Sequence, residues 1–193
     1  MDFNEIDKLS PVELAYFLRS SAYVAAAENL RSKLDQGYFD TDRGIYSGTP
    51  FHFTMLDPRA LAAWTSNWRG HPRRLHNWNW AEYQREFINS PSRFELAVWS
   101  GTVLCGLAVG KLSRGRENLS VQLLEGSPDP HHPLKGITRF FLIETAQFYA
   151  VTMQCKWLYL IDPLEGAQRL YEDMGFVLAR TSGKMIAYAK ELR

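Results

Sequence analysis

Apolar and polar positions follow a helical period near the start of the chain and shorter, strand-like runs afterwards. Ser10 and Glu13 have the spacing of a capping box, which predicts that a helix begins at Pro11. This helix is expected to run towards Leu34 and to end before Gly37. Its expected apolar face comprises Leu14, Phe17, Leu18, Ala22 and Ala25.

The remainder of the chain alternates between strands and helices. Strands are predicted at 51–56, 93–99, 102–112, 119–126 and 156–161, with a final hairpin formed by 176–180 and 184–192 across a turn at 181–183. Helices are predicted at 58–68, 80–89, 136–154 and 164–174. In this order of elements, one crossover connection is expected to make two neighbouring strands parallel. The predicted fold class is α/β (α+β), with a mixed sheet covered by helices.

The stretch 37–50 is rich in Gly, Asp and Thr and is predicted to be a connection. It separates an N-terminal helical extension, residues 1–48, from a main domain, residues 49–193. For the extension we consider three roles: a contact in a homodimer, a wall of the substrate site, or an enlargement of the core.

Composition narrows the classes of partner. A formal net charge of +1 gives no overall basic field, so nucleic acid is not the expected partner. Cys105 and Cys155 lack C-x-x-C spacing and are expected to be free thiols. The acidic start of the chain and the absence of a long apolar run favour a cytoplasmic location without a membrane segment. The five histidines show no ligand spacing with Cys, Asp or Glu, so no metal is expected.

The junction "HPLKGITRFFLIETA" leads from a loop directly into the helix predicted at 136–154. The start of a helix presents free backbone N–H groups to an anion. Gly136 permits close approach, Lys135 adds a positive charge, and Thr138 offers a hydroxyl group. Gly136 could equally be an ordinary loop glycine, and the residues alone leave both interpretations open.

Together with the order of elements and "GAQRLYEDMGF" near the end of the chain, this junction resembles the GNAT superfamily of acyl-CoA-dependent N-acetyltransferases. That family carries the loop pattern Q/R-x-x-G-x-G/A, which falls here on residues 133–138. Gly136 matches, whereas Pro133 and Thr138 differ from the pattern. The resemblance implies a mostly antiparallel sheet with helices on both faces. It also implies that acetyl-CoA is bound at Lys135, Gly136, Ile137 and Thr138.

A second motif of the family, A-x-x-L-Y-x-x-x-G-F, is complete in Ala167, Leu170, Tyr171, Gly175 and Phe176. The resemblance implies that Tyr171 protonates the leaving thiolate of coenzyme A. The alternative is an amphipathic tyrosine packed against the sheet with its hydroxyl at the rim.

The resemblance also implies that the strand containing Leu123 and Leu124 separates from its neighbour and admits the pantetheine arm. A backbone N–H on this strand would polarise the thioester carbonyl. Glu125, at its end, is the first candidate for the general base, acting directly or through a water. His131 or His132 is the alternative, although all three could simply be exposed polar residues.

The segment from Trp64 to Trp80 has the most unusual composition in the chain, with four tryptophans among arginines and histidines. Aromatic rings interleaved with arginines can bind a nucleobase or an anionic acceptor. The more ordinary interpretation is that the tryptophans are core anchors while the arginines face water.

The leading hypothesis is therefore an enzyme, an N-acetyltransferase that transfers an acetyl or acyl group from acetyl-CoA to a primary amine. The acceptor could be a small molecule, a protein amine or, less in keeping with the near-neutral charge, an aminoacyl-tRNA. The alternative is a catalytically weak module of the same fold that binds a protein partner.

Overall fold

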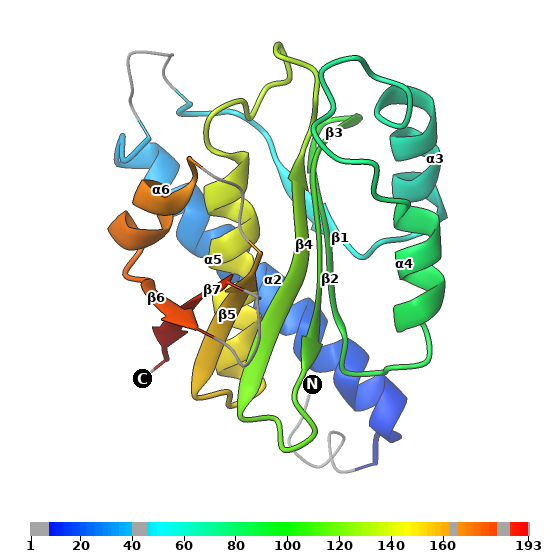
Figure 1. The fold of residues 1–193 in the computed structure, drawn as a ribbon, viewed down its shortest axis with the longest axis vertical. Helices are drawn as coiled ribbons and strands as arrows, with labels where there is room; N and C mark the ends of the chain where they lie inside the picture. The colour runs from blue at the N-terminus through cyan, green and yellow to red at the C-terminus, as the bar shows by residue number, and fades with distance from the viewer. Residues whose placement is uncertain (1–7, 40–45, 163–165, 181–185, 193) are drawn as a thin grey trace.

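The computed structural model describes residues 8–39, 46–162, 166–180 and 186–192. Seven strands in these ranges form one sheet in the order β1-β2-β3-β4-β5-β7-β6 (Figure 1). The strands are β1 (His52–Thr54), β2 (Phe94–Ser100), β3 (Val103–Leu112), β4 (Asn118–Gly126), β5 (Trp157–Ile161), β6 (Val177–Arg180) and β7 (Ile186–Glu191). The predicted turn at 181–183 lies outside the described residues.

Only β4 and β5 are parallel among the strand pairs of the described sheet. Helix α5 (Thr138–Thr152) makes the crossover between them, which confirms the one crossover that the sequence predicts. The hairpin between β2 and β3 is also confirmed, because Ser100 pairs with Val103 and Gly101 has a φ of 56°.

Helices cover both faces of the sheet, which confirms the predicted fold class. Helices α2 (Pro11–Asp35) and α5 lie on one face, whereas α3 (Pro58–Asn67) and α4 (Trp80–Phe87) lie on the other (Figure 1). The short helix α6 (Gln168–Asp173) precedes the last two strands. Of the helix predicted at 164–174, residues 164 and 165 lie outside the described residues, and 166–167 precede the helix instead of belonging to it. No helix in the described part of the chain is long and apolar enough to span a bilayer.

Helix α2 begins with the predicted capping box between Ser10 and Glu13. Its buried face differs from the predicted one, because most of the expected apolar residues are only half-buried. Arg19 lies on the buried face instead, where its Nη1 is 3.2 Å from Oε1 of Glu95 on β2. The Tyr23 hydroxyl donates a hydrogen bond to the carbonyl oxygen of the same glutamate. Helix α2 thus shares one core with α5 and the sheet, and the boundary drawn at residue 48 stays a prediction.

A second core lies between the sheet and helices α3 and α4. It is built around four buried tryptophans, Trp64, Trp68, Trp80 and Trp99. Three of them come from the unusual tryptophan-rich segment, so the interpretation of those residues as core anchors is confirmed.

Candidate active site

Strands β4 and β5 separate part of the way along their length. Their parallel pairing covers only Asn118–Val121 on β4 and Trp157–Leu160 on β5. On the other side of β4, Val109 pairs with Leu123 and Gly110 with Val121, so Gln122 is an extra residue in the β3–β4 ladder. Such a bulge bends the strand that carries it. Beyond Val121, β4 therefore leaves β5 and opens a gap in the sheet.

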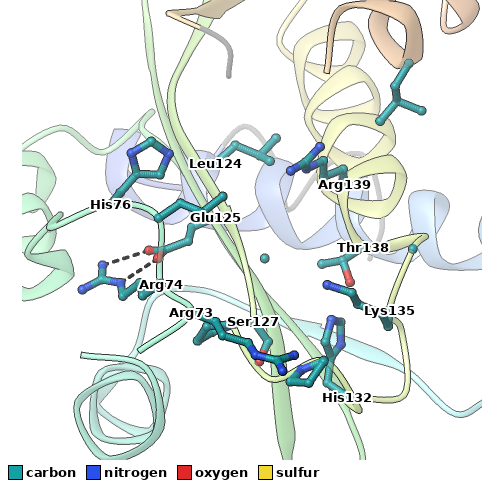
Figure 2. Close-up of a pocket in the computed structure, with 16 residues that line it drawn as sticks. Arg73, Arg74, His76, Leu124, Glu125, Ser127, His132, Lys135, Thr138 and Arg139 are labelled. Carbon is teal, nitrogen blue, oxygen red and sulfur yellow. Dashed lines mark hydrogen bonds and ion pairs between the residues drawn. The ribbon is translucent and has the colours of Figure 1, made fainter. Parts of the chain in front are cut away.

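A cavity of about 380 Å³, called here the main cavity, lies where β4 ends. One wall is the loop between α3 and α4 (residues 73–76), and the opposite wall is the start of α5 with the loop before it (residues 130–139). The last residues of strand β4 and the two residues after it, together 124–128, lie between these walls (Figure 2). A smaller cavity of about 30 Å³, the strand gap, continues between β4 and β5 and shares Leu124 and Arg139 with the main cavity.

The start of α5 presents unpartnered backbone donors to the main cavity. The N–H groups of Ile137 and Thr138 both donate to the carbonyl oxygen of Leu134, at 3.2 and 3.0 Å. Within the described part of the chain, the N–H groups of Gly136 and Arg139 have no acceptor. Because both residues line the main cavity, their donors and the positive end of the helix are available to an anion there.

Thr138 is accommodated without closing this site. Its hydroxyl group donates to the Leu134 carbonyl oxygen at 2.7 Å. Its methyl group packs against β3, where a Cβ atom added to Gly106 would lie 2.6 Å from Thr138 Cγ2. Gly106 therefore makes room for the larger residue that stands where the family pattern has Gly or Ala.

The structure brings Lys135, Gly136, Thr138 and Leu124 together at the main cavity. The side chains of the two other predicted cofactor-binding residues point elsewhere. Leu123 packs in the tryptophan core, and Ile137 packs in the core beneath α5. Only their backbone groups are left for a role at the cavity.

Glu125 lies at the end of β4 and is buried in the wall of the main cavity. Its Oε1 accepts a hydrogen bond from Nε of Arg74 at 2.6 Å, and its Oε2 accepts from Nη2 at 3.0 Å. Oε2 also accepts from Nε1 of Trp80 at 2.5 Å. The side chains of Glu125 and Arg74 are each 6% exposed, so this is a buried, bidentate ion pair. Glu125, the predicted base, therefore lines the cavity with both of its carboxylate oxygens already hydrogen-bonded.

Of the two loop histidines, only His132 lines the main cavity. Burial and, as a smaller effect, the nearby Lys135 together lower the pKa of His132 to about 4, against the opposing effect of Asp129. The ring is therefore neutral at neutral pH, and its buried Nδ1 has no partner among the described residues. His131 is exposed and lies outside the cavity lining.

Tyr171 on α6 lines the strand gap together with Leu124 and Arg139. Burial raises the pKa of Tyr171 above its usual 10.0, while Arg139 acts in the opposite direction and Tyr188 in the same one. The hydroxyl group is thus protonated at neutral pH and can act as a proton donor. Tyr171 does not line the main cavity itself, but the strand gap that it lines shares Leu124 and Arg139 with that cavity.

Three residues of the unusual segment that the sequence analysis considered for binding an anionic acceptor, Arg73, Arg74 and His76, line the main cavity. They lie in the loop between α3 and α4, and His76 stacks on Trp78 with ring centroids 3.9 Å apart. The signal that pointed to them was the density of Arg, His and Trp between Trp64 and Trp80. In the described part of the chain, no group of three or more His, Cys, Asp or Glu residues could hold a metal ion.

No protein-family model matches the sequence, and no curated protein matches it. Solved structures do match the fold. Ard1 from Thermoplasma volcanium has a TM-score of 0.56 at 12% identity, over 74% of this chain and 98% of its own. The ribosomal-protein-S18-alanine N-acetyltransferase from Escherichia coli has a TM-score of 0.55 at 16% identity, over 74% and 94%. An aminoglycoside 6'-N-acetyltransferase solved with coenzyme A has a TM-score of 0.57 at 14% identity, over 73% and 97%.

These proteins share their fold with this chain at low sequence identity. The chain therefore has the fold of the GNAT acetyltransferases, as the sequence motifs predict. The neighbours are covered almost completely, whereas about a quarter of this chain has no counterpart in them.

Proposed function

We propose that this protein is an acyl-CoA-dependent N-acetyltransferase that transfers an acetyl group from acetyl-CoA to a primary amine. The observation that carries the proposal is the combination of two features at one cavity. Strand β4 departs from β5 after Val121, and unpartnered N–H groups of Gly136 and Arg139 face the space beside that departure. The long arm of an acyl-CoA thioester would fit the gap between the strands, and its diphosphate would fit the helix start at the end of that gap.

The diphosphate of the donor is assigned to the start of α5. The N–H groups of Gly136 and Arg139 would donate to it, and the side chain of Lys135 would add a charge-assisted contact. Thr138 contributes its backbone rather than its hydroxyl, since the hydroxyl is bonded to Leu134. Pro133 supplies no N–H group, but it does not line the cavity.

When bound, acetyl-CoA supplies a thioester that is activated for attack by an amine. A backbone N–H of the β4 segment Leu123–Glu125 is assigned to polarise its carbonyl group. The amine nitrogen forms the new C–N bond, the C–S bond breaks, and the Tyr171 hydroxyl gives its proton to the departing thiolate. The proton released by the amine is assigned to Glu125, directly or through a water, with His132 as the alternative acceptor.

The test has two stages on one protein sample. Acetyl-CoA is titrated by calorimetry and by thermal shift, and thiol release is then followed with a panel of primary amines. Saturable binding with stabilisation, followed by amine-dependent thiol release, is the expected result. Absence of binding at millimolar concentration, with acetyl-CoA and with longer acyl-CoA donors, would overturn the proposal and favour a module that only binds a protein partner.

A further inference from the structure

The main cavity is strongly cationic. Four of its lining side chains, Arg73, Arg74, Lys135 and Arg139, carry a positive charge. Glu125 is the single carboxylate among the described residues that line it, and this carboxylate is already bonded to Arg74 and Trp80. No free acidic group in that lining is therefore available to bind an ammonium ion.

These cations lie on two different walls. Lys135 and Arg139 belong to the α5 wall, where the Lys135 side chain and the N–H group of Arg139 are assigned to the donor's diphosphate. Arg73 and Arg74 belong to the loop between α3 and α4, across the end of β4 (Figure 2). Once the α5 wall is occupied, the opposite wall still presents its own positive charge.

Arg73 is the unsatisfied member of this wall. Its side chain is exposed, and its guanidinium group has no hydrogen bond or ion pair with any described residue. Among the described residues, the one hydrogen bond of Arg73 is donated by its backbone N–H to Nδ1 of His71, at 3.2 Å. This bond fixes the loop while leaving the side chain available. Arg74, in contrast, already donates hydrogen bonds from Nε to Glu125 and from Nη2 to Glu125 and to the carbonyl oxygen of Trp78.

A cationic wall selects between classes of amine. An amine that carries only positive charge is repelled by it, whereas an attached carboxylate or phosphate would gain charge-assisted bonds to a guanidinium group. The same positive surroundings lower the pKa of a bound ammonium group. The neutral amine that attacks the thioester is then formed more easily, which reduces the demand on a base as heavily bonded as Glu125.

We propose that the acceptor is a small amine that also carries a carboxylate or phosphate group, and that Arg73 binds this anionic group. The inference rests on the proposed acetyltransferase function. The acceptor must be small because the donor's arm shares the same cavity of about 380 Å³.

The experiment compares amines that differ only in the anionic group. α-Amino acids are paired with their carboxamides, ω-amino acids with their carboxamides, and phosphoethanolamine with ethanolamine. Acetyl-CoA binding is established first, so that a failure of the proposed function is recognised separately. We expect kcat/KM for the acidic member of at least one pair to exceed that of its partner by roughly tenfold or more, the effect of a charge-assisted hydrogen bond. Comparing the amino acid pairs with the phosphoethanolamine pair shows whether the site prefers a carboxylate or a phosphate group.

Two variants of Arg73 and one control connect the preference to this residue. Arg73→Gln should reduce the preference for the acidic member towards unity, and Arg73→Glu should shift it towards amines without an anionic group. Arg69→Gln is the matched control, because Arg69 is an exposed arginine of the same segment that does not line the cavity. It should keep the wild-type preference.

Faster transfer to the neutral or cationic members, or an unchanged preference in Arg73→Glu, overturns the proposal while leaving the acetyltransferase function intact. If acetyl-CoA binds but no pair is turned over, the same pairs are titrated by calorimetry into protein saturated with coenzyme A. Tighter binding of the acidic member that is lost in Arg73→Gln then supports the proposal. Equal or undetectable binding of both members counts against it.

Discussion

The hydroxyl group of Tyr171 is held in its protonated form by burial, which raises the pKa of this residue above 10.0. We expect Tyr171→Phe to lower the rate of acetyl transfer about 10²- to 10⁴-fold, the usual contribution of a positioned acid. The Kd for acetyl-CoA should stay nearly unchanged, because the hydroxyl is needed only as the thiolate leaves. Single-turnover thiol release and calorimetry measure the two quantities.

Tyr188 on β7 provides the matched control for that substitution. Its ring centroid lies 5.7 Å from that of Tyr171, and it is also buried, but it lines neither the main cavity nor the strand gap. Tyr188→Phe should retain the wild-type rate. Equal single-turnover rates for Tyr171→Phe and the wild type would remove the acid role from Tyr171.

The buried pair of Arg74 and Glu125 makes a prediction about stability. Arg74→Met removes the cation and leaves a buried carboxylate with Trp80 as its remaining described donor. We expect the free energy of unfolding to fall by roughly 3–5 kcal/mol, as for other buried pairs that lose one partner. The double variant Arg74→Met/Glu125→Gln should recover part of this loss, because it removes the uncompensated charge. Urea denaturation of the single and double variants gives the coupling; strictly additive losses would contradict it.

The sequence was informative about some of these residues and silent about their partners. Glu125 is a candidate because it ends a strand, and Tyr171 is a candidate because its motif is local. Arg74 was expected to face water, yet it is buried against a residue 51 positions later in the chain. A pairing of that kind is decided by how the loop between α3 and α4 folds over β4, which local patterns do not encode.

At the scale of elements, helix caps and alternating apolar residues predict the order of helices and strands, and that order predicts one parallel pair of neighbouring strands, which is β4 with β5. The bulge at Gln122 was not predicted, because it appears only when the registers of β3 and β4 are compared. The packing of Thr138 against β3 was likewise not predictable from the local sequence. It depends on Gly106 in β3, whose missing side chain leaves room for the threonine methyl group.

The start of α5 is the element on which donor binding is expected to depend. Gly136 has a φ of 97°, which disfavours other residues, and it faces the proposed diphosphate site. We expect Gly136→Asp to weaken acetyl-CoA binding by tenfold or more, since the new carboxylate opposes the phosphates and its side chain fills their space. Calorimetric titration measures the change.

Gly48 allows the effect of backbone strain to be subtracted. It also has a positive φ, 75°, but an added Cβ would meet nothing within 4 Å, and the residue does not line the cavity. Gly48→Asp should therefore lose some stability while keeping its affinity for acetyl-CoA. A similar loss of affinity in both variants would show that strain, and not the phosphate site, is responsible.

At the scale of the whole molecule, the main cavity joins the layers that cover opposite faces of the sheet. The loop between α3 and α4 comes from one layer and the start of α5 from the other (Figure 1). Helix α2 packs against α5 in the shared core. Lys33 on α2 also forms an ion pair with Glu144 on α5, at 2.6 Å. Conditions that weaken the global fold should therefore disturb the site as well.

Low pH is such a condition, and the shifted pKa of His132 determines whether acid raises or lowers the free energy of unfolding. Burial lowers the pKa of His132 to about 4 in the folded protein, whereas an unfolded chain has an ordinary histidine pKa near 6.5. Between these values the unfolded chain binds a proton that the folded protein does not. The free energy of unfolding should therefore fall as pH decreases from about 6.5 to about 4, by up to about 1.4 kcal/mol per pH unit from this residue.

His132→Gln should remove this part of the pH dependence, because glutamine does not titrate. His131→Gln is the matched control: the neighbouring histidine is exposed and should leave the dependence as in the wild type. Urea denaturation of the three proteins at intervals between pH 7 and pH 4 measures it, and carboxylate titrations contribute equally to all three. We expect a flatter dependence of the free energy of unfolding on pH for His132→Gln alone, because only that variant lacks the buried imidazole. Identical dependences for the two variants would mean that His132 can take up a proton without loss of the fold.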